Sequence, residues 1–95
     1  MAQANTPDPT TGRIVHYALT EADVDRITDE RERHPETAYG NKSHPGDVVP
    51  LLVVRALDEE RHVSGQAFLD SAERLWIADA AEGDGLGEWH YPPKA

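Results

Sequence analysis

The clearest pattern along the chain lies between residues 47 and 80, where three segments have the hydrophobic spacing of strands. Residues 48–57 are apolar at both odd and even positions, which predicts a strand covered on both of its faces. Residues 62–69 and 74–78 alternate between apolar and polar positions, as a strand does when one face is packed. Charged and small residues separate the segments, so together they predict an antiparallel meander joined by tight turns.

The residues before this meander predict one strand followed by one helix. Residues 13–19 alternate well enough to form the first strand. Thr20 is a suitable N-cap, and Asp23 stands where the partner in a capping box would be. The helix is expected over residues 20–33, because Pro35 pushes the residue before it out of the helical region.

A short aromatic segment at residues 88–91 predicts the last strand. Five short strands and one helix are too few for a two-sheet sandwich. They predict a mainly β fold, a small five-stranded SH3-like barrel with one short α-helix after the first strand. In such a barrel the last strand pairs with the first and hides both edges of the meander. Residues 1–11 are predicted to be a flexible N-terminal arm, and residues 12–93 a single barrel domain.

Composition narrows the classes of function. The 95 residues suit one domain, and the absence of cysteine excludes disulfides and thiolate metal sites. Acidic residues number 18 against 9 Lys and Arg, for a formal charge of -9. A field of this sign repels nucleic acids and anionic lipids, and the scattered cations form no basic patch, so neither partner is expected. The charge indicates either a well-solvated surface or a face for a basic protein.

The sequence also bears on where the protein works. Its N-terminus lacks the basic segment and apolar run of a secretory signal, and nowhere do enough apolar residues follow one another to span a membrane. We therefore expect a soluble protein that is made in the cytoplasm.

Five histidines raise the question of a metal site: His16, His34, His44, His62 and His90. No two have the spacing that places ligands on one helix face, and none forms an HxH pair on a strand. No metal site and no cofactor are therefore predicted. Closure of the barrel would bring His16 and His90 together, and only their convergence with a carboxylate would favour a metal-dependent or hydrolytic enzyme.

Other candidates for catalysis are weak. The glycine-rich loop after Asp79 matches neither a calcium loop nor a phosphate-binding loop. Ser64 lies near His62, but there is no G-x-S-x-G elbow and no evident carboxylate to orient the histidine. Glu59 and Glu60 belong to a turn that water can reach, which leaves no cleft for general acid or base catalysis. No catalytic residue is predicted, and the chain is not expected to be an enzyme.

Aromatic residues are the remaining candidates, because they carry much of the binding energy at protein interfaces. Trp76 has the opposite parity to Leu75 and Ile77, so it faces outward if those two fill the core. The alternative is that Trp76 covers the helix or the end of the barrel. The residues predicted to contact a partner are Phe68, Trp76, Trp89 and Tyr91, with Pro7 and Pro9 of the arm.

Several short motifs follow one another along the chain: Gly40-Asn41, Gly46-Asp47-x-x-Pro50, Val53-Val54-Arg55, Gln66-x-x-Leu69-Asp70, Trp76 and Gly87-x-Trp89-x-x-Pro92. In these motifs, over residues 12–93, the chain resembles a group of small, mostly unassigned proteins encoded by bacteriophages and prophages of actinobacteria. That group often has a Gly-Asn-Asp turn where this chain has Ser71-Ala72-Glu73. The resemblance implies a phage origin and an SH3-like sheet, and it implies no reaction.

Together with the acidic composition and the lack of a predicted site, this resemblance favours a non-enzymatic structural protein of a phage. We expect it to decorate or cement the capsid by docking on the major capsid protein or another virion protein, in many copies that would form a homo-oligomer on the capsid lattice. Its location would then be the virion, after synthesis in the host cytoplasm. The alternative is a soluble acidic regulator or anti-defence factor whose helix binds a basic host protein.

Overall fold

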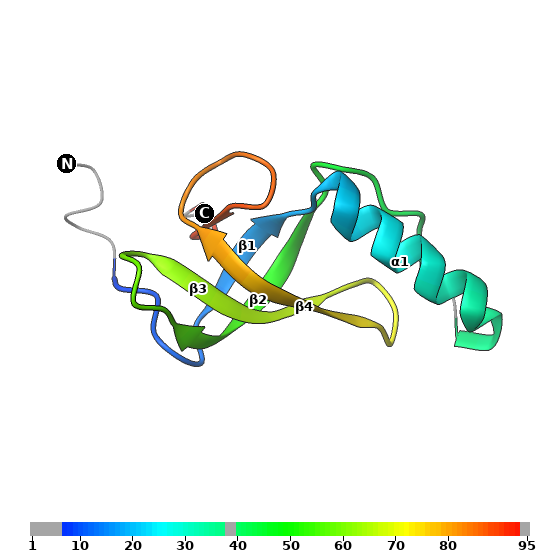
Figure 1. Ribbon diagram of the computed structural model, residues 1–95, viewed down its shortest axis with the longest axis horizontal. Helices are drawn as coiled ribbons and strands as arrows, with labels where there is room; N and C mark the ends of the chain where they lie inside the picture. Colours follow the sequence, from blue (N-terminus) through cyan, green and yellow to red (C-terminus); the bar gives the residue numbers. More distant parts are fainter. Residues whose placement is uncertain (1–6, 38–39, 94–95) are drawn as a thin grey trace.

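A computed structural model describes residues 7–37 and 40–93. The elements are β1 (Ile14–Ala18), α1 (Glu21–Arg33), the short 3-10 helix η2 (Pro35–Thr37), β2 (Val48–Ala56), β3 (His62–Phe68), β4 (Arg74–Ala81) and β5 (Trp89–His90). The strands form one antiparallel sheet in the order β4-β3-β2-β1-β5. The sheet curls into a half-barrel, and α1 lies at one end of the molecule (Figure 1). The mainly β class with one short helix is therefore confirmed.

The predicted meander is present as β2, β3 and β4. Leu51 lies opposite Ala67 in the β2–β3 pair, and Ala67 lies opposite Leu75 in the β3–β4 pair, so one inward-facing row crosses all three strands. A register shift interrupts each pair: one lies between Val53 and Arg55, the other between Val63 and Gly65. Irregularities of this kind increase the local twist, which helps a small sheet to curl over its own core.

The last strand pairs with the first, as expected. His16 lies opposite His90 and Tyr17 opposite Trp89 in the β1–β5 pair. The barrel nevertheless stays open, because within the described residues β4 meets β5 only through a single bridge between Glu82 and Trp89, beyond the end of β4. The prediction that both edges of the meander are hidden is therefore wrong for β4. A β5 of 2 residues is too short to cover an edge of 8 residues.

The capping box predicted for the helix is confirmed. Thr20 Oγ1 accepts the backbone N–H of Asp23 at 3.0 Å, and Asp23 Oδ2 accepts the backbone N–H of Thr20 at 3.0 Å. The same carboxylate oxygen also accepts the hydroxyl of Tyr17 at 2.6 Å. Burial of the ring and this bond raise the pKa of Tyr17, so the hydroxyl stays protonated and holds the helix start against β1.

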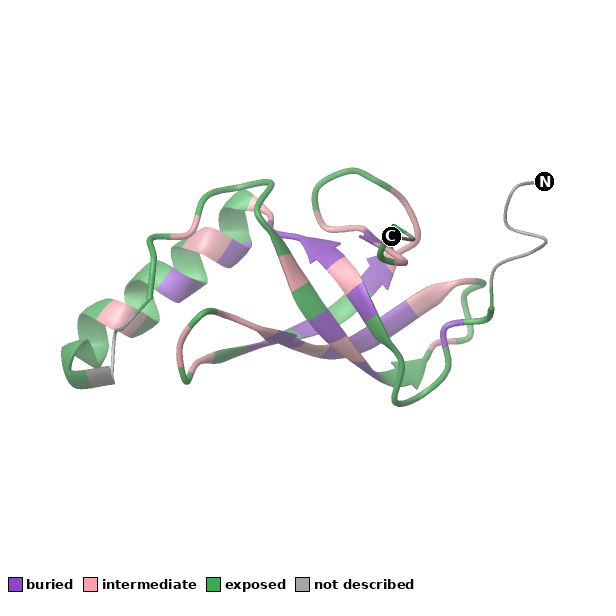
Figure 2. Ribbon diagram, turned by 180° about the vertical axis from the view of Figure 1, so that it is seen from behind, coloured by how far each residue is buried: buried purple, intermediate pink, exposed green. Residues whose placement is uncertain are grey.

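The core occupies the concave side of the sheet. Val15, Leu19, Leu51, Val63 and Trp89 have no exposed surface, and Ile27 is the hydrophobic residue of α1 that is buried among them. Figure 2 shows the buried residues concentrated in the strands, whereas most of α1 is exposed. The helix therefore covers one end of the core and leaves the other side of the sheet uncovered.

The prediction that β2 is covered on both faces is wrong. Leu51 and Val53 are buried, but Val48 is 52% exposed and Val54 is 40% exposed. The chain has one α-helix in its described part, and that helix packs on the concave side, so no element is left to cover the convex side. The apolar residues of β2 therefore form one buried row and one exposed row.

Residues 7–11, which the sequence placed in the flexible arm, contact the sheet. The hydroxyl of Thr11 donates to the carbonyl of Val54 at 3.0 Å, and the hydroxyl of Tyr91 donates to the carbonyl of Pro7 at 2.9 Å. Arg61 adds an ion pair with Asp8 at 3.3 Å. These contacts hold the segment in place. Residues 1–6 of the predicted arm lie outside the described residues.

Candidate docking surface

The convex side of the sheet carries the largest group of exposed apolar residues on the molecule. We use the name outer face for a set of strand residues that alternate with buried ones: Ile14, His16, Val48, Pro50, Leu52, Val54, Gln66, Phe68, Arg74, Trp76 and His90. Among the described residues, four of the five large hydrophobic residues with high exposure belong to this face: Ile14 at 59%, Val48 at 52%, Trp76 at 43% and Val54 at 40%.

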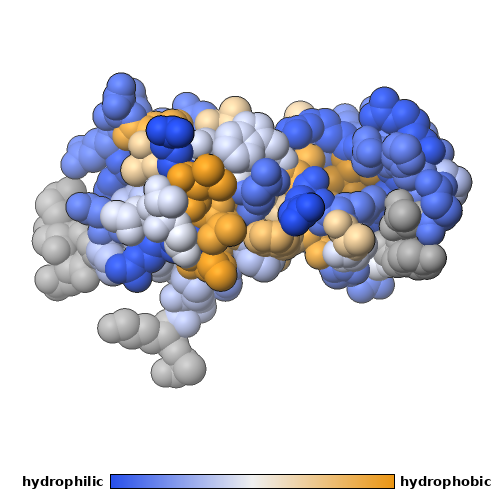
Figure 3. Space-filling view, turned by 90° about the horizontal axis from the view of Figure 1, so that it is seen from below, coloured by the Kyte–Doolittle hydropathy of each residue, from blue (hydrophilic) through white to orange (hydrophobic). Residues whose placement is uncertain are grey.

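Strand register makes part of the outer face continuous. Ile14 lies opposite Leu52, Leu52 opposite Gln66, and Gln66 opposite Trp76, so a single row crosses four strands. Side chains directly opposite one another on the same face of a sheet are in contact distance. The view from below in Figure 3 shows apolar side chains in patches on either side of the middle of the molecule, with hydrophilic side chains between and around them. Grouped apolar exposure of this kind is typical of a binding surface.

The outer face also differs from the rest of the chain in charge. None of the residues named in its definition is acidic, although the chain has 18 acidic residues and a formal charge of -9. Beyond the register shift in the β3–β4 pair, the exposed strand residue Asp79 lies next to this surface, where it contacts His62. Its ionisable residues are Arg74, His16 and His90. Carboxylates are strongly hydrated, and they are depleted at the centres of protein interfaces for that reason. Composition and charge therefore mark the same surface.

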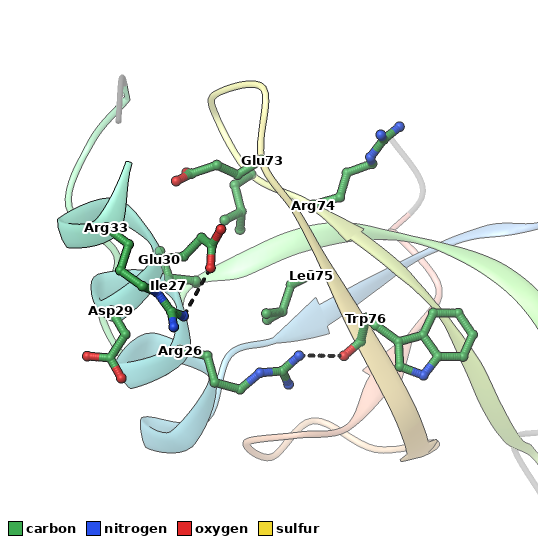
Figure 4. A pocket seen from close by; sticks show the side chains of 10 residues that line it. Arg26, Ile27, Asp29, Glu30, Arg33, Glu73, Arg74, Leu75 and Trp76 are labelled. Carbon is green, nitrogen blue, oxygen red and sulfur yellow. Dashed lines mark hydrogen bonds and ion pairs between the residues drawn. The ribbon is translucent and has the colours of Figure 1, made fainter. Parts of the chain in front are cut away.

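Trp76 points outward, as its parity in the sequence predicted. Leu75 and Ile77 on either side of it are buried at 7% and 4% exposure. Figure 4 shows the Trp76 ring directed away from the space between α1 and β4. The alternative, in which the ring covers the helix, is therefore not what the structure has. Phe68 also belongs to the outer face and is half-buried.

The other residues predicted to contact a partner are placed differently. Trp89 has no exposed surface, because its ring fills the core and its Nε1 donates to the carbonyl of Arg61 at 2.9 Å. Pro9 is buried, whereas Pro7 is exposed. Tyr91 is half-buried with its ring edge-on to Trp89. Trp89 and Pro9 are thus too buried to contact a partner. The presence of aromatic residues in the sequence did not indicate that Trp89 is buried.

His16 and His90 meet as predicted, with ring centroids 5.6 Å apart in an edge-on arrangement. The nearest carboxylate to His90 is Asp84, whose Oδ1 lies 3.9 Å from His90 Nδ1 and whose side chain is 97% exposed. Within residues 7–37 and 40–93, no three His, Asp or Glu side chains are grouped as a metal site requires. The pair is therefore part of the outer face.

His62 has a carboxylate partner that the sequence did not reveal. Its Nδ1 lies 2.6 Å from Oδ1 of Asp79, because the bulge in β4 turns Asp79 toward β3. A catalytic triad would also need a serine hydroxyl bonded to the imidazole. Ser64 is buried at 5% exposure, and no hydrogen bond joins it to His62 in the described part of the chain.

Two of the short motifs, Gly40-Asn41 and Gln66-x-x-Leu69-Asp70, contact each other near the C-terminal end of α1. The backbone N–H of Asn41 donates to Asp70 Oδ2 at 2.9 Å, which lowers the pKa of Asp70. A Cβ on Gly40 would lie 2.5 Å from the carbonyl oxygen of Asp70, so this contact needs glycine. Arg31 of α1 completes the junction by donating to Glu73 Oε1 at 2.8 Å and to the carbonyl of Asn41 at 2.8 Å.

The exposed side of α1 carries an acidic stripe, defined as Glu21, Asp25, Asp29 and Glu32. All four are exposed, and none has an ion pair with another described residue. The arginines of α1 pair elsewhere, for example Arg31 with Glu73 and Arg33 with Glu30. Like charges four residues apart on a helix repel one another. The stripe therefore weakens the helix.

Relief of this repulsion should be measurable. The variant Asp29→Lys places a cation between Asp25 and Glu32, and we expect it to stabilise the protein by about 0.5 kcal/mol. Asp58→Lys in the β2–β3 turn makes the same charge change away from the helix and is the control. Urea unfolding followed by circular dichroism gives both values. An equal gain from the two variants would show that only net charge matters.

Comparisons with known proteins identified no relative: the chain matches no family model, no curated protein and no solved structure. Separately, no helix in the described residues is long and apolar enough to cross a membrane.

Proposed function

We propose that this chain is a non-enzymatic structural protein of a phage virion that decorates or cements the capsid by docking on the major capsid protein. The outer face carries the proposal, because it is largely apolar and continuous across strands, and its central row from Ile14 to Trp76 has no carboxylate on a chain with a formal charge of -9. Burial of an apolar surface contributes about 25 cal/mol per Å² that is removed from water. Many weak copies on a repeating lattice then bind firmly through avidity.

The shape of the sheet supports a large partner over a second copy. The outer face is the convex side of a half-barrel, and two convex surfaces make a small contact when they meet (Figure 1). Two copies would also bring together two chains that each carry a formal charge of -9. We propose in addition that the half-barrel is of the SH3-like type, as the resemblance to phage proteins implies.

Substitution on the outer face tests the docking. Ile14→Asp introduces a carboxylate at a residue that is 59% exposed, so we expect the fold to persist and capsid binding to fall at least about tenfold. The assay mixes purified variant with virions that lack the protein and measures the bound fraction after sedimentation. Leu86→Asp is the matched control, because Leu86 is 55% exposed and lies outside the outer face. Equal loss in both variants would contradict the proposal, as would virions in which mass spectrometry detects none of this chain.

The acidic stripe on α1 favours a second candidate, a soluble regulator or anti-defence factor that binds a basic host protein. Binding of this kind relies on charge, so it weakens as salt rises. Capture of a single host protein at low salt, lost at high salt and lost in a variant with Asp25→Asn and Asp29→Asn, would support it. Retention of that protein by the same variant would rule out the stripe as the contact.

A further inference from the structure

A notch opens at the end of the sheet where β2 and β3 separate. The last pair between them at this end joins Leu51 and Ala67, although β2 begins at Val48 and β3 continues to Phe68. Pro50, which has no N–H, lies in this unpaired part of β2, where the strand has a neighbour on one side only. The loop before β2 closes the far side, and the notch encloses about 520 Å³.

The notch has apolar walls and a polar rim. Its apolar walls are Val48, Val49, Pro50, Phe68 and Leu69, and the fully buried Leu19 lies beneath them. Asp47, Asp70 and Lys42 belong to the rim. Sites that take one large group from a partner usually combine such walls with a few fixed polar groups. Val48, Pro50 and Phe68 also belong to the outer face, so the notch is continuous with the candidate docking surface.

The two rim carboxylates are held in position by the backbone. Asp70 Oδ2 accepts the N–H of Asn41 at 2.9 Å, and Asp47 Oδ2 accepts the N–H of His44 at 2.9 Å. Asp70 Oδ1 also lies 3.8 Å from Arg31 Nη2, and Asp47 Oδ2 lies 3.8 Å from His44 Nδ1. A carboxylate offers about four acceptor positions, so each keeps capacity for a further donor. The notch therefore suits a large apolar group that carries a hydrogen-bond donor at its edge.

A second hollow among the described residues is less suitable. It lies between α1 and β4, encloses about 380 Å³ and is shown in Figure 4. Arg26 crosses it to donate to the carbonyl of Trp76 at 3.2 Å, and the pair of Arg33 with Glu30 lines its helix side. A group that entered this space would have to break or desolvate these charged contacts.

We propose that the notch is the anchor pocket of the docking surface and that it takes a tryptophan side chain of the partner protein. A planar indole fills apolar walls with little loss of conformational freedom, and its single N–H matches a rim carboxylate. An arginine or lysine would have to leave its charge at the rim, and its flexible stem would fill the notch less well. The inference rests on the proposed function for the identity of the partner, but the pocket itself can be tested without it.

The test is a titration of the ¹⁵N-labelled chain with N-acetyl-tryptophan amide at millimolar concentrations, followed by nuclear magnetic resonance. We expect saturable shifts confined to the backbone amides of residues 41–43, 48–49 and 68–70. N-acetyl-arginine amide is the comparison ligand and should bind more weakly. Shifts that are absent, spread over other surfaces, or stronger with the arginine amide would overturn the proposal.

Two valines of the outer face give a matched pair of variants. Val48 lines the notch and Val54 does not, yet both are exposed residues of β2. Val48→Asp should weaken binding of the tryptophan amide at least about tenfold, because a carboxylate replaces an apolar wall, and Val54→Asp should leave it within about twofold. Both variants should keep a dispersed spectrum. Equal effects on binding would show that the notch is not the site.

The outcomes separate this inference from the proposed function. If the tryptophan amide binds at the notch but this protein is not found in virions, the pocket is supported and the capsid is ruled out as its partner. If Val54→Asp weakens capsid binding and Val48→Asp does not, the docking function is supported and the notch is ruled out as its anchor pocket. Self-association of the wild-type chain that Trp76→Ala abolishes would make a second copy the source of the tryptophan and contradict the proposal.

Discussion

The variant Trp89→Ala is expected to lose about 3–5 kcal/mol of folding free energy, the usual cost of removing a large buried aromatic side chain. Trp89 has no exposed surface, and its ring lies 5.3 Å from that of Tyr91 and 5.5 Å from the guanidinium of Arg61. A domain of this length has only about 5–14 kcal/mol of stability in total. The urea midpoint of the Trp89→Ala protein should therefore fall strongly, and at the lower end of this stability range a large part of the protein should be unfolded at 37 °C, as circular dichroism would show.

Trp89→Phe is the control for this variant. It keeps most of the ring but leaves the carbonyl of Arg61 without the N–H that lies 2.9 Å away, so a smaller loss of about 1–3 kcal/mol is expected. Trp76→Ala removes the same kind of side chain from the outer face, where it is 43% exposed, and should cost less than either change. Similar losses for Trp76→Ala and Trp89→Ala would contradict the placement of Trp89 in the core.

The variant Gly65→Ala is expected to lose about 3 kcal/mol or more, at the upper end of the range for overpacked cores. A Cβ on Gly65 would lie 2.1 Å from the carbonyl oxygen of Leu52 and 3.2 Å from the side chain of Leu51. The backbone oxygen cannot move aside without breaking the β2–β3 pair, in which Gly65 lies opposite Val53. The expected result is a lower urea midpoint with an unchanged dependence on urea concentration.

Gly12→Ala is a control that separates collision from backbone strain. Gly12 has a positive φ of 93°, but a Cβ there would meet no atom within 4 Å. The change should therefore cost only the strain of an L-residue at positive φ, about 1–2 kcal/mol. A loss for Gly65→Ala no larger than that for Gly12→Ala would show that the β2–β3 pair relaxes easily around the added methyl group.

Features that depend on neighbours in the sequence were predictable. The three strands of the meander follow from alternation over a few residues, and the start of α1 follows from Thr20 and Asp23, whose bonds are formed within one helical turn. The outward direction of Trp76 followed from parity alone. Pairing of the last strand with the first was also predictable, because a curled sheet of this size has few other partners for it.

Features that depend on where distant elements come to lie were not predictable. The apolar residues of β2 predicted cover on both faces, but a single helix covers one end of the concave side only. The exposed row that includes Ile14 and Leu52 was therefore missed. Trp89 was taken for a surface residue, because nothing in a strand of 2 residues shows which way its side chains point. Pro50 was the available signal for the notch, since proline inside a strand indicates a missing neighbour.

The unpaired edge of β4 affects how the protein behaves at high concentration. Exposed strand edges are templates for joining molecules into continuous sheets, the first step toward fibrils. Here the guanidinium of Arg26 occupies the carbonyl of Trp76, and the register shift near Gly65 distorts the strand beyond it. Both features make β4 a poorer template for pairing with the strand of another copy. An Arg26→Ala protein would be expected to seed thioflavin-positive aggregates at concentrations at which the wild type stays clear.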